Sequence, residues 1–215
     1  MRALTSAELA WWRAQVARLT PLTDADVAAV AGQLRMRMLA EGEPYLRSGA
    51  PATAVGLVRS GLLREAFLLA DGRERVRAFG IAGDFAGSLS DLLTGGAARC
   101  EVIACAPTRV ITLPWAAVTH AVATRPAWRA ALAAATQRLY LIKAEREYEL
   151  LALDAAARYQ RFRARMGAAG DELPLGHVAS YLGITPEHLS RLRRRLGLAR
   201  ARPAAASRSP RRSRS

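Results

Sequence analysis

The spacing of apolar positions predicts helices at the start of the chain and short strands after them. Residues 7–19 carry apolar side chains three and four positions apart, which is typical of an amphipathic helix. Thr23 and Asp24 form an N-cap signal for a second helix, which we expect to extend through Leu34. Between residues 41 and 114 glycines recur between short apolar runs. Such a segment is typical of a β-sandwich, barrel or jelly roll.

One hairpin can be placed within this β-rich segment. Asp71 and Gly72 separate two predicted strands, and glycine readily adopts the positive φ that a tight turn needs. In the strand that follows, the alternate positions Arg73, Arg75 and Arg77 are all basic. We therefore expect one face of this strand to be exposed to solvent.

A long helix is predicted to start at Pro126, because neither glycine nor proline occurs from residue 127 to residue 153. Its length of about 27 residues corresponds to about 40 Å. Positions three and four apart on one face form an imperfect coiled-coil seam: Leu132, Ala135, Leu139, Ile142, Arg146, Glu149 and Leu153. A helix of this kind favours a dimer interface, and packing on the chain's own β-rich segment is the alternative.

Two short helices are predicted between residues 175 and 196. Ala179 is small enough to allow a close crossing, and Gly183 supplies the turn between the helices. Thr185 is the predicted N-cap of the second helix and Pro186 is its first residue. Three leucines of this helix are expected to face inward: Leu189, Leu192 and Leu196. The pattern predicts a helix-turn-helix.

The outward face of the second helix carries side chains suited to reading DNA bases. Its residues follow the i, i+3, i+4, i+7 spacing and form one stripe for a major groove: Glu187, Ser190, Arg191 and Arg194. Arg191 matches guanine, Glu187 can accept from cytosine N4, and Ser190 can bond a base or a phosphate. The flanking residues are expected to contact phosphates: Thr185, His188, Arg193 and Arg195. A solvated helix pair with a structural role is the alternative.

The charge distribution favours a polyanionic partner for the C-terminal part. The net charge is +14; residues 1–125 hold 14 basic and 11 acidic residues, whereas residues 126–215 hold 18 basic and 7 acidic residues. Such an excess suits DNA, RNA or an acidic membrane surface. Residues 201–215 are predicted to form a disordered basic tail that adds affinity for phosphates without reading sequence. The alternative function is therefore a non-specific nucleic-acid or anionic-surface binding protein.

Several other classes of protein find no support in the sequence. No apolar run is long enough to cross a bilayer and no signal-peptide pattern is present, so we expect a cytoplasmic protein without a membrane partner. Cys100 and Cys105 are the only cysteines, and without further ligands in a metal-binding pattern we expect no metal. No nucleophile and base, phosphate loop or paired carboxylates stand out, so we do not expect an enzyme.

Three stretches of the chain resemble those of a known protein family. They are Gly83-Asp84-Phe85-Ala86-Gly87, the helix that starts at Pro126, and the segment from Ala179 to Arg191. With the order of the elements, they make residues 20–197 resemble the Crp/Fnr family of bacterial transcription regulators. The resemblance implies an α+β fold: an N-terminal β-roll (double-stranded β-helix or jelly roll) with flanking helices, a long dimerisation helix and a C-terminal helix-turn-helix domain.

The resemblance also implies a division into domains and a set of partners. The implied parts are a sensor domain similar to cyclic nucleotide-binding domains (1–125), a dimerisation helix (126–155), a DNA-binding domain (156–200) and the tail (201–215). A homodimer would bind a palindrome in double-stranded DNA, with half-sites about one helical turn apart. Family members contact TTGA-type half-sites through a Glu-x-x-Ser-Arg pattern, matched here by Glu187, Ser190 and Arg191. RNA polymerase is a further implied partner.

The sequence departs from the cAMP-binding members of this family at three places. Gly87-Ser88-Leu89 stands where those members have Gly-Glu-Leu, Ala98-Arg99 where they have Arg-Ser or Arg-Thr, and Lys143-Ala144 where they have Thr-Ser. The family residues bind the ribose, the cyclic phosphate and the base, so we expect neither cAMP nor a cofactor. Two alternatives stay open. The protein has either no effector or an anionic one, bound between the β-roll and the long helix by Ser88, Leu89, Arg99 and Lys143.

Overall fold

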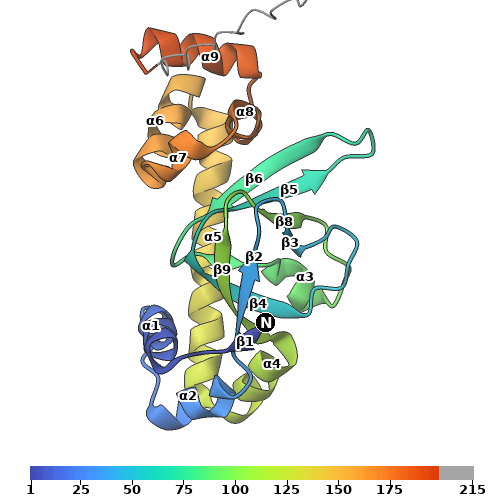
Figure 1. The fold of residues 1–215 in the computed structure, drawn as a ribbon, viewed down its shortest axis with the longest axis vertical. Helices are drawn as coiled ribbons and strands as arrows, with labels where there is room; N and C mark the ends of the chain where they lie inside the picture. The colour runs from blue at the N-terminus through green and yellow to red at the C-terminus, as the bar shows by residue number, and fades with distance from the viewer. Residues whose placement is uncertain (199–215) are drawn as a thin grey trace, which may run out of the picture.

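One long helix organises the molecule. The computed structural model describes residues 1–198, so the tail predicted at residues 201–215 lies outside the described residues. Helix α5 (Pro126–Ala152) runs along the longest axis, beside the β-roll (Figure 1). Three helices lie at one end of it: α1 (Ser6–Ala17), α2 (Asp24–Ala31) and α4 (Trp115–Thr124). Four lie at the other end: α6 (Ala155–Met166), α7 (Ala169–Glu172), α8 (Leu175–Leu182) and α9 (Pro186–Arg195).

Helix α1 begins one residue before its predicted start, and α2 begins at its predicted N-cap. The Thr5 hydroxyl accepts a hydrogen bond from the Glu8 N–H, and the Glu8 carboxylate accepts one from the Thr5 N–H. Thr23 forms the same capping box at the start of α2. The predicted extent of α2 was wrong, because the helix ends at Ala31. Leu34 lies in the connection between α2 and the next strand, and its side chain is buried.

The β-roll consists of two antiparallel sheets that share a core, which confirms the predicted α+β fold with an N-terminal roll. One sheet has the order β1-β2-β9-β4-β7 and the other the order β3-β8-β5-β6. The strands are β1 (Arg2–Ala3), β2 (Arg35–Leu39), β3 (Pro44–Leu46), β4 (Ala54–Ser60), β5 (Leu63–Leu68), β6 (Glu74–Gly80), β7 (Phe85–Ala86), β8 (Glu101–Ala104) and β9 (Thr108–Pro114). The short helix α3 (Leu89–Thr94) lies between β7 and β8 and was not predicted.

The β5–β6 hairpin turns at Gly72, as predicted, with φ +78°. Its register shifts once, so that Arg77 is an extra residue in β6 between the pairs Glu65 with Ala78 and Ala66 with Val76. The shift breaks the period-two alternation and turns Arg77 toward the β-roll. The predicted exposure of Arg77 was therefore wrong: its side chain is partly buried, and its Nε lies 3.2 Å from a carboxylate oxygen of Glu65.

The predicted coiled-coil seam of α5 faces this same chain. Ala135 is buried, and Leu139 and Ile142 line a cavity against the β-roll. Further along, Arg146 pairs with Glu149 and donates a hydrogen bond to a backbone carbonyl of α8. This face therefore contacts the same chain, which was the alternative that the sequence left open, although Ile142 is 45% exposed.

The C-terminal helices share an aromatic core with the hairpin. The rings of Phe79 in β6, Phe162 in α6 and Tyr181 in α8 lie 5.4 to 5.9 Å apart, centroid to centroid. These spacings are within the range that favours tilted and edge-to-face aromatic pairs. Phe79 is almost completely buried at the centre of the contact.

Polar contacts hold the same packing in register. The Ser180 hydroxyl of α8 accepts a hydrogen bond from the Val76 N–H at 3.0 Å and donates to the Glu74 carbonyl at 3.4 Å. The Arg165 guanidinium of α6 donates to the Phe79 carbonyl at 2.9 Å. Strand β6 therefore runs beside α8 and fixes the C-terminal helices on the β-roll (Figure 1).

The variant Phe79→Ala tests this shared core. We expect it to lower the free energy of unfolding by about 3–5 kcal/mol, because it removes buried ring contacts and leaves a cavity. Chemical denaturation monitored by circular dichroism measures the change. The control Phe67→Ala removes an exposed ring from the same hairpin and should cost less than about 1 kcal/mol. Equal losses for the two variants would contradict the packing described here.

Candidate nucleic-acid interface and ligand cavity

The turn between α8 and α9 is built as the sequence predicts. Gly183 adopts a left-handed conformation with φ +68°, which ends α8. The Ile184 N–H closes this end by donating to the Ala179 carbonyl at 3.1 Å. The Thr185 hydroxyl then accepts from the His188 N–H at 3.2 Å, and Pro186 is the first residue of α9. Local geometry thus sets the angle at which α9 leaves α8.

The inner faces of both helices are buried. Ala179 and Leu182 of α8 pack in one core with Leu189 and Leu192 of α9. Leu196 was predicted to join them, but it follows the last residue of α9 and is 37% exposed. The prediction that Leu196 faces inward was wrong, because α9 ends one residue before Leu196.

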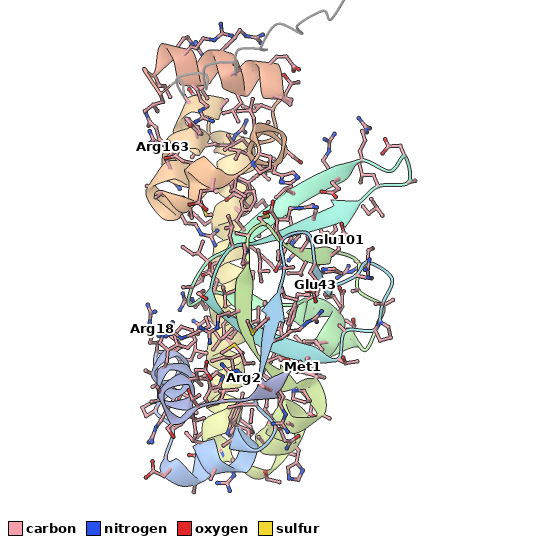
Figure 2. The ribbon with its side chains drawn as sticks, in the orientation of Figure 1. Met1, Arg2, Arg18, Glu43, Glu101 and Arg163 are labelled. Carbon is pink, nitrogen blue, oxygen red and sulfur yellow. The ribbon has the colours of Figure 1, made fainter. Side chains whose placement is uncertain are left out.

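The outer face of α9 is open. Glu187, Arg191 and Arg194 are exposed, and Ser190 is half-buried among them. Of the flanking residues, Thr185 and Arg195 are exposed, and His188 and Arg193 are half-buried. Figure 2 shows nitrogen-tipped side chains projecting from α9 at the end of the molecule. The structure therefore brings all the predicted DNA-contacting residues together on or beside one surface.

The charges on this surface are available to a partner. Within residues 1–198 no carboxylate lies within ion-pair distance of the four arginines of α9: Arg191, Arg193, Arg194 and Arg195. The pKa of Glu187 is lowered, first by a hydrogen bond from its own N–H and then by the Thr185 hydroxyl. Glu187 is therefore a carboxylate at neutral pH and acts as a hydrogen-bond acceptor.

The four predicted effector residues do not form one site. The Ser88 hydroxyl is buried and donates to Asp91 at 2.7 Å, and the Arg99 Nε donates to the same carboxylate at 2.9 Å. Burial would raise the pKa of Asp91, but these hydrogen bonds outweigh it and lower the pKa. Leu89 and Lys143 line a separate cavity. Sequence reasoning missed Asp91, because nothing in the pattern indicates that a short helix places it between Ser88 and Arg99.

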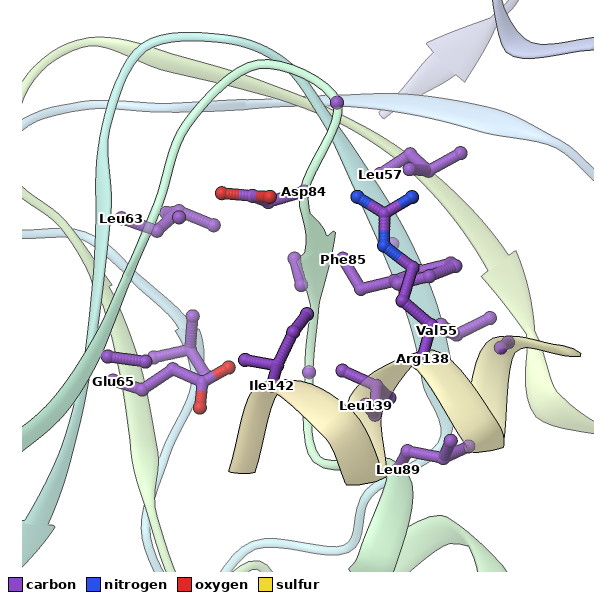
Figure 3. Close-up of a pocket in the computed structure, with 18 of the residues that line it drawn as sticks. Val55, Leu57, Leu63, Glu65, Asp84, Phe85, Leu89, Arg138, Leu139 and Ile142 are labelled. Atoms are coloured by element: carbon purple, nitrogen blue, oxygen red, sulfur yellow. The ribbon is translucent and has the colours of Figure 1, made fainter. Parts of the chain in front are cut away.

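This cavity lies between the β-roll and α5 and has a volume of about 300 Å³. Most of its walls are apolar: Val55, Leu57, Phe85 and Leu89 from the roll, and Leu139 and Ile142 from α5 (Figure 3). Arg138 projects into it from the same turns of α5 (Figure 3).

Charged side chains gather where β5, β6 and α5 meet the cavity. Glu65, Arg77 and Lys143 all line it. Burial raises the pKa of Glu65, whereas burial and then the Arg77 guanidinium lower the pKa of Lys143. Sequence reasoning missed Glu65, Arg77 and Arg138 as cavity residues. The register shift in β6 leaves no signal in the sequence, and Arg138 lies one position before Leu139 of the predicted seam.

Comparison with known proteins defines the β-roll. Residues 36–125 match the family model of the cyclic nucleotide-binding domain. The β-roll from β2 onward, together with α4, is therefore similar to domains of this type. No curated protein sequence matches the chain.

Solved structures resemble the chain beyond this domain. FixK2 from Bradyrhizobium japonicum is 24% identical with a TM-score of 0.65, over 76% of this chain and 84% of FixK2. The c-di-GMP responsive global regulator CLP from Xanthomonas campestris is 16% identical with a TM-score of 0.66, over 84% of this chain and 96% of CLP. A CooA mutant from Carboxydothermus hydrogenoformans is 19% identical with a TM-score of 0.59, over 77% of each chain.

These similarities establish the fold. The chain has the fold of the Crp/Fnr-family regulators, which confirms the resemblance found in its sequence. Among residues 1–198, no helix is both long and apolar enough to cross a membrane.

The variant Thr185→Ala tests the N-cap that orients α9. We expect it to lower the free energy of unfolding by about 1 kcal/mol, because the His188 N–H loses its acceptor. Thr185→Ser keeps a hydroxyl at this position and should retain most of the stability. Urea denaturation of the three proteins measures the effect. Identical midpoints for the alanine variant and the parent protein would exclude a capping role.

Proposed function

We propose that this protein is a sequence-specific DNA-binding transcription regulator of the Crp/Fnr type, which binds a palindromic site as a homodimer. The open face of α9 carries the proposal. Glu187 and Arg191 are exposed there, whereas Leu189 and Leu192 on the opposite side are buried. One face of the helix thus packs on the protein, and the other is free for a major groove, with α8 and α9 as the helix-turn-helix.

The side chains on this face suit the edges of bases. The Arg191 guanidinium can donate two hydrogen bonds to guanine O6 and N7, and the Glu187 carboxylate can accept from cytosine N4. Ser190 can bond a base or a phosphate. The remaining polar residues extend the contact along the helix or to phosphates: Arg194, Thr185, His188, Arg193 and Arg195. The Glu-x-x-Ser-Arg pattern supports TTGA-type half-sites.

A second copy of the chain is the proposed partner of the outward face of α5. Leu141, Tyr148 and Leu151 are 58%, 50% and 81% exposed, and large exposed apolar patches mark interaction sites. With Ala144 they repeat at spacings of three and four residues, two positions after the predicted seam and thus about 200° around the helix. Such a repeat suits a coiled-coil pair, whose two-fold axis would present two α9 helices to a palindrome.

The β-roll is the proposed input domain, with an effector other than cAMP. Ser88 and Arg99, which stand where cAMP-binding members hold ribose and phosphate, are both bonded to Asp91. This arrangement supports a different ligand chemistry. RNA polymerase is the proposed protein partner. The proposal assigns a cytoplasmic, regulatory role and no catalytic step to the chain.

The variant Arg191→Ala tests base reading. We expect it to weaken binding to the preferred palindrome by about 1–3 kcal/mol and to relax preference at one base pair, with little change on random DNA. Fluorescence anisotropy with both DNAs at fixed salt measures this. The control Arg18→Ala removes an exposed arginine that follows α1, at the opposite end of the molecule (Figure 2), and should change neither affinity.

The rival function, non-specific binding through charge, predicts other results. If binding were driven by charge alone, Arg191→Ala would weaken binding to the palindrome and to random DNA equally. That outcome would refute the groove assignment. Deleting residues 201–215 removes five arginines. We expect this deletion to weaken binding to both DNAs by similar factors and to reduce the salt dependence of binding.

The variant Leu151→Glu tests the proposed dimer. It places a charge at the most exposed position of the apolar repeat, so we expect a dimer of the parent protein to become a monomer. Sedimentation velocity measures the change. The monomeric variant should also lose most of the preference that the parent dimer has for the full palindrome over a half-site. Leu93→Glu, at a 53% exposed leucine on α3, is the matched control. A Leu151→Glu protein that stays dimeric would disprove this interface.

A further inference from the structure

The cavity beside α5 is large for an empty space in a protein. Its volume of about 300 Å³ lies at the lower end of the range of about 300–1,000 Å³ for small-molecule sites. Protein interiors contain few voids larger than a water molecule, and the walls of an empty apolar cavity lose packing contacts. The apolar walls from Leu57, Phe85, Leu139 and Ile142 therefore suit the apolar body of a ligand (Figure 3).

Both acidic residues that line this cavity already have basic partners. The Arg77 Nε lies 3.2 Å from a Glu65 carboxylate oxygen. An Arg165 Nη lies 3.2 Å from a carboxylate oxygen of Asp84, which also accepts from a backbone N–H. Each of the two carboxylates thus has an arginine within ion-pair distance.

Two more cations line the cavity from α5. Within the described part of the chain, Arg138 and Lys143 have no carboxylate within ion-pair distance. Both residues line the cavity and are exposed overall, so their charged groups are accessible to a ligand. Burial lowers the pKa of Lys143 most, and the nearby Arg77 guanidinium lowers it further.

We infer that this cavity binds a small amphipathic acid, whose apolar body lies among the walls and whose carboxylate is held by Arg138 and Lys143. A carboxylate matches the guanidinium fork and the ammonium, and it supplies the negative charge that the lining lacks. A neutral apolar molecule would leave both cations unmatched. As the input to DNA binding, this ligand rests on the proposed function, whereas its binding to the cavity does not.

The test uses the full chain and three probes in isothermal titration calorimetry. Decanoate carries both an apolar body and a carboxylate, 1-decanol lacks the charge, and acetate lacks the body. We expect decanoate to saturate one site per chain and to bind at least about tenfold more tightly than 1-decanol. Acetate should show no saturable binding. Absence of decanoate binding, or equal affinities for decanoate and 1-decanol, would overturn the inference.

Variants locate the carboxylate. Arg138→Gln and Lys143→Gln should each weaken decanoate binding by about threefold to tenfold and leave 1-decanol binding unchanged. Arg129→Gln is the matched control, because Arg129 is an exposed arginine of α5 outside the cavity lining. Thermal unfolding confirms that all three variants are folded. An equal loss of decanoate affinity in the control would show a general charge effect and reject the assigned site.

The two proposals can fail separately. The same protein samples are titrated with the palindrome and with random DNA. Decanoate binding without sequence preference would reject the proposed function and leave the ligand site standing. Sequence preference without decanoate binding would reject the ligand site alone.

Discussion

The contacts that α5 makes at its two ends are the constraint on which the rest of the structure depends. Near its start, the buried Trp128 stacks on Trp12 with 6.2 Å between ring centroids and donates its indole N–H to the Asp26 carbonyl at 3.1 Å. Near its end, Arg146 lies over the Tyr181 ring, 3.8 Å from its centroid. Because a single uninterrupted helix makes both contacts, it fixes the distance between the N-terminal helices and the C-terminal helix pair.

The face of α5 that points away from the β-roll remains exposed. Helix α5 has 27 residues, and the β-roll lies along only one side of it. The apolar positions Leu141, Tyr148 and Leu151 are left in solvent on the other side. Burying a side chain such as Leu contributes about 1.5–3 kcal/mol. An unpartnered α5 therefore leaves a considerable stabilisation unused, which supports the assignment of this face to a second copy.

Sequence reasoning succeeded where local chemistry decides structure. Thr23, Gly72, Gly183 and Thr185 act through hydrogen bonds or dihedral angles within a few residues, and the structure has each in its predicted role. Helix α4 was missed because its N-cap, Pro114, makes no side-chain cap hydrogen bond.

Sequence reasoning failed where distant contacts decide. Two apolar repeats run along α5, and periodicity alone does not tell which one packs on the roll. The inward turn of Arg77 depends on a register shift against β5, and the roles of Ser88 and Arg99 depend on Asp91. The residues of the DNA-contacting face were therefore predictable from α9 itself, but those of the cavity were not.

The cavity and the helix pair are also joined by short paths of contacts. Arg77 lines the cavity, and its neighbour Val76 donates to the Ser180 hydroxyl of α8. Arg146 lines it too and donates to the Tyr181 carbonyl of the same helix.

A ligand shifts the position of a helix only if it binds two arrangements with different affinity. A movement of α8 away from β6 would break the first contact, and a movement away from the end of α5 would break the second. Either would alter a part of the cavity lining. If the ligand binds the two arrangements with different affinity, ligand binding shifts the equilibrium between the two positions of α9 by the same free energy, because linkage is reciprocal. The coupling between the two sites thus depends on β6 and the end of α5, the two segments that the cavity and α8 share.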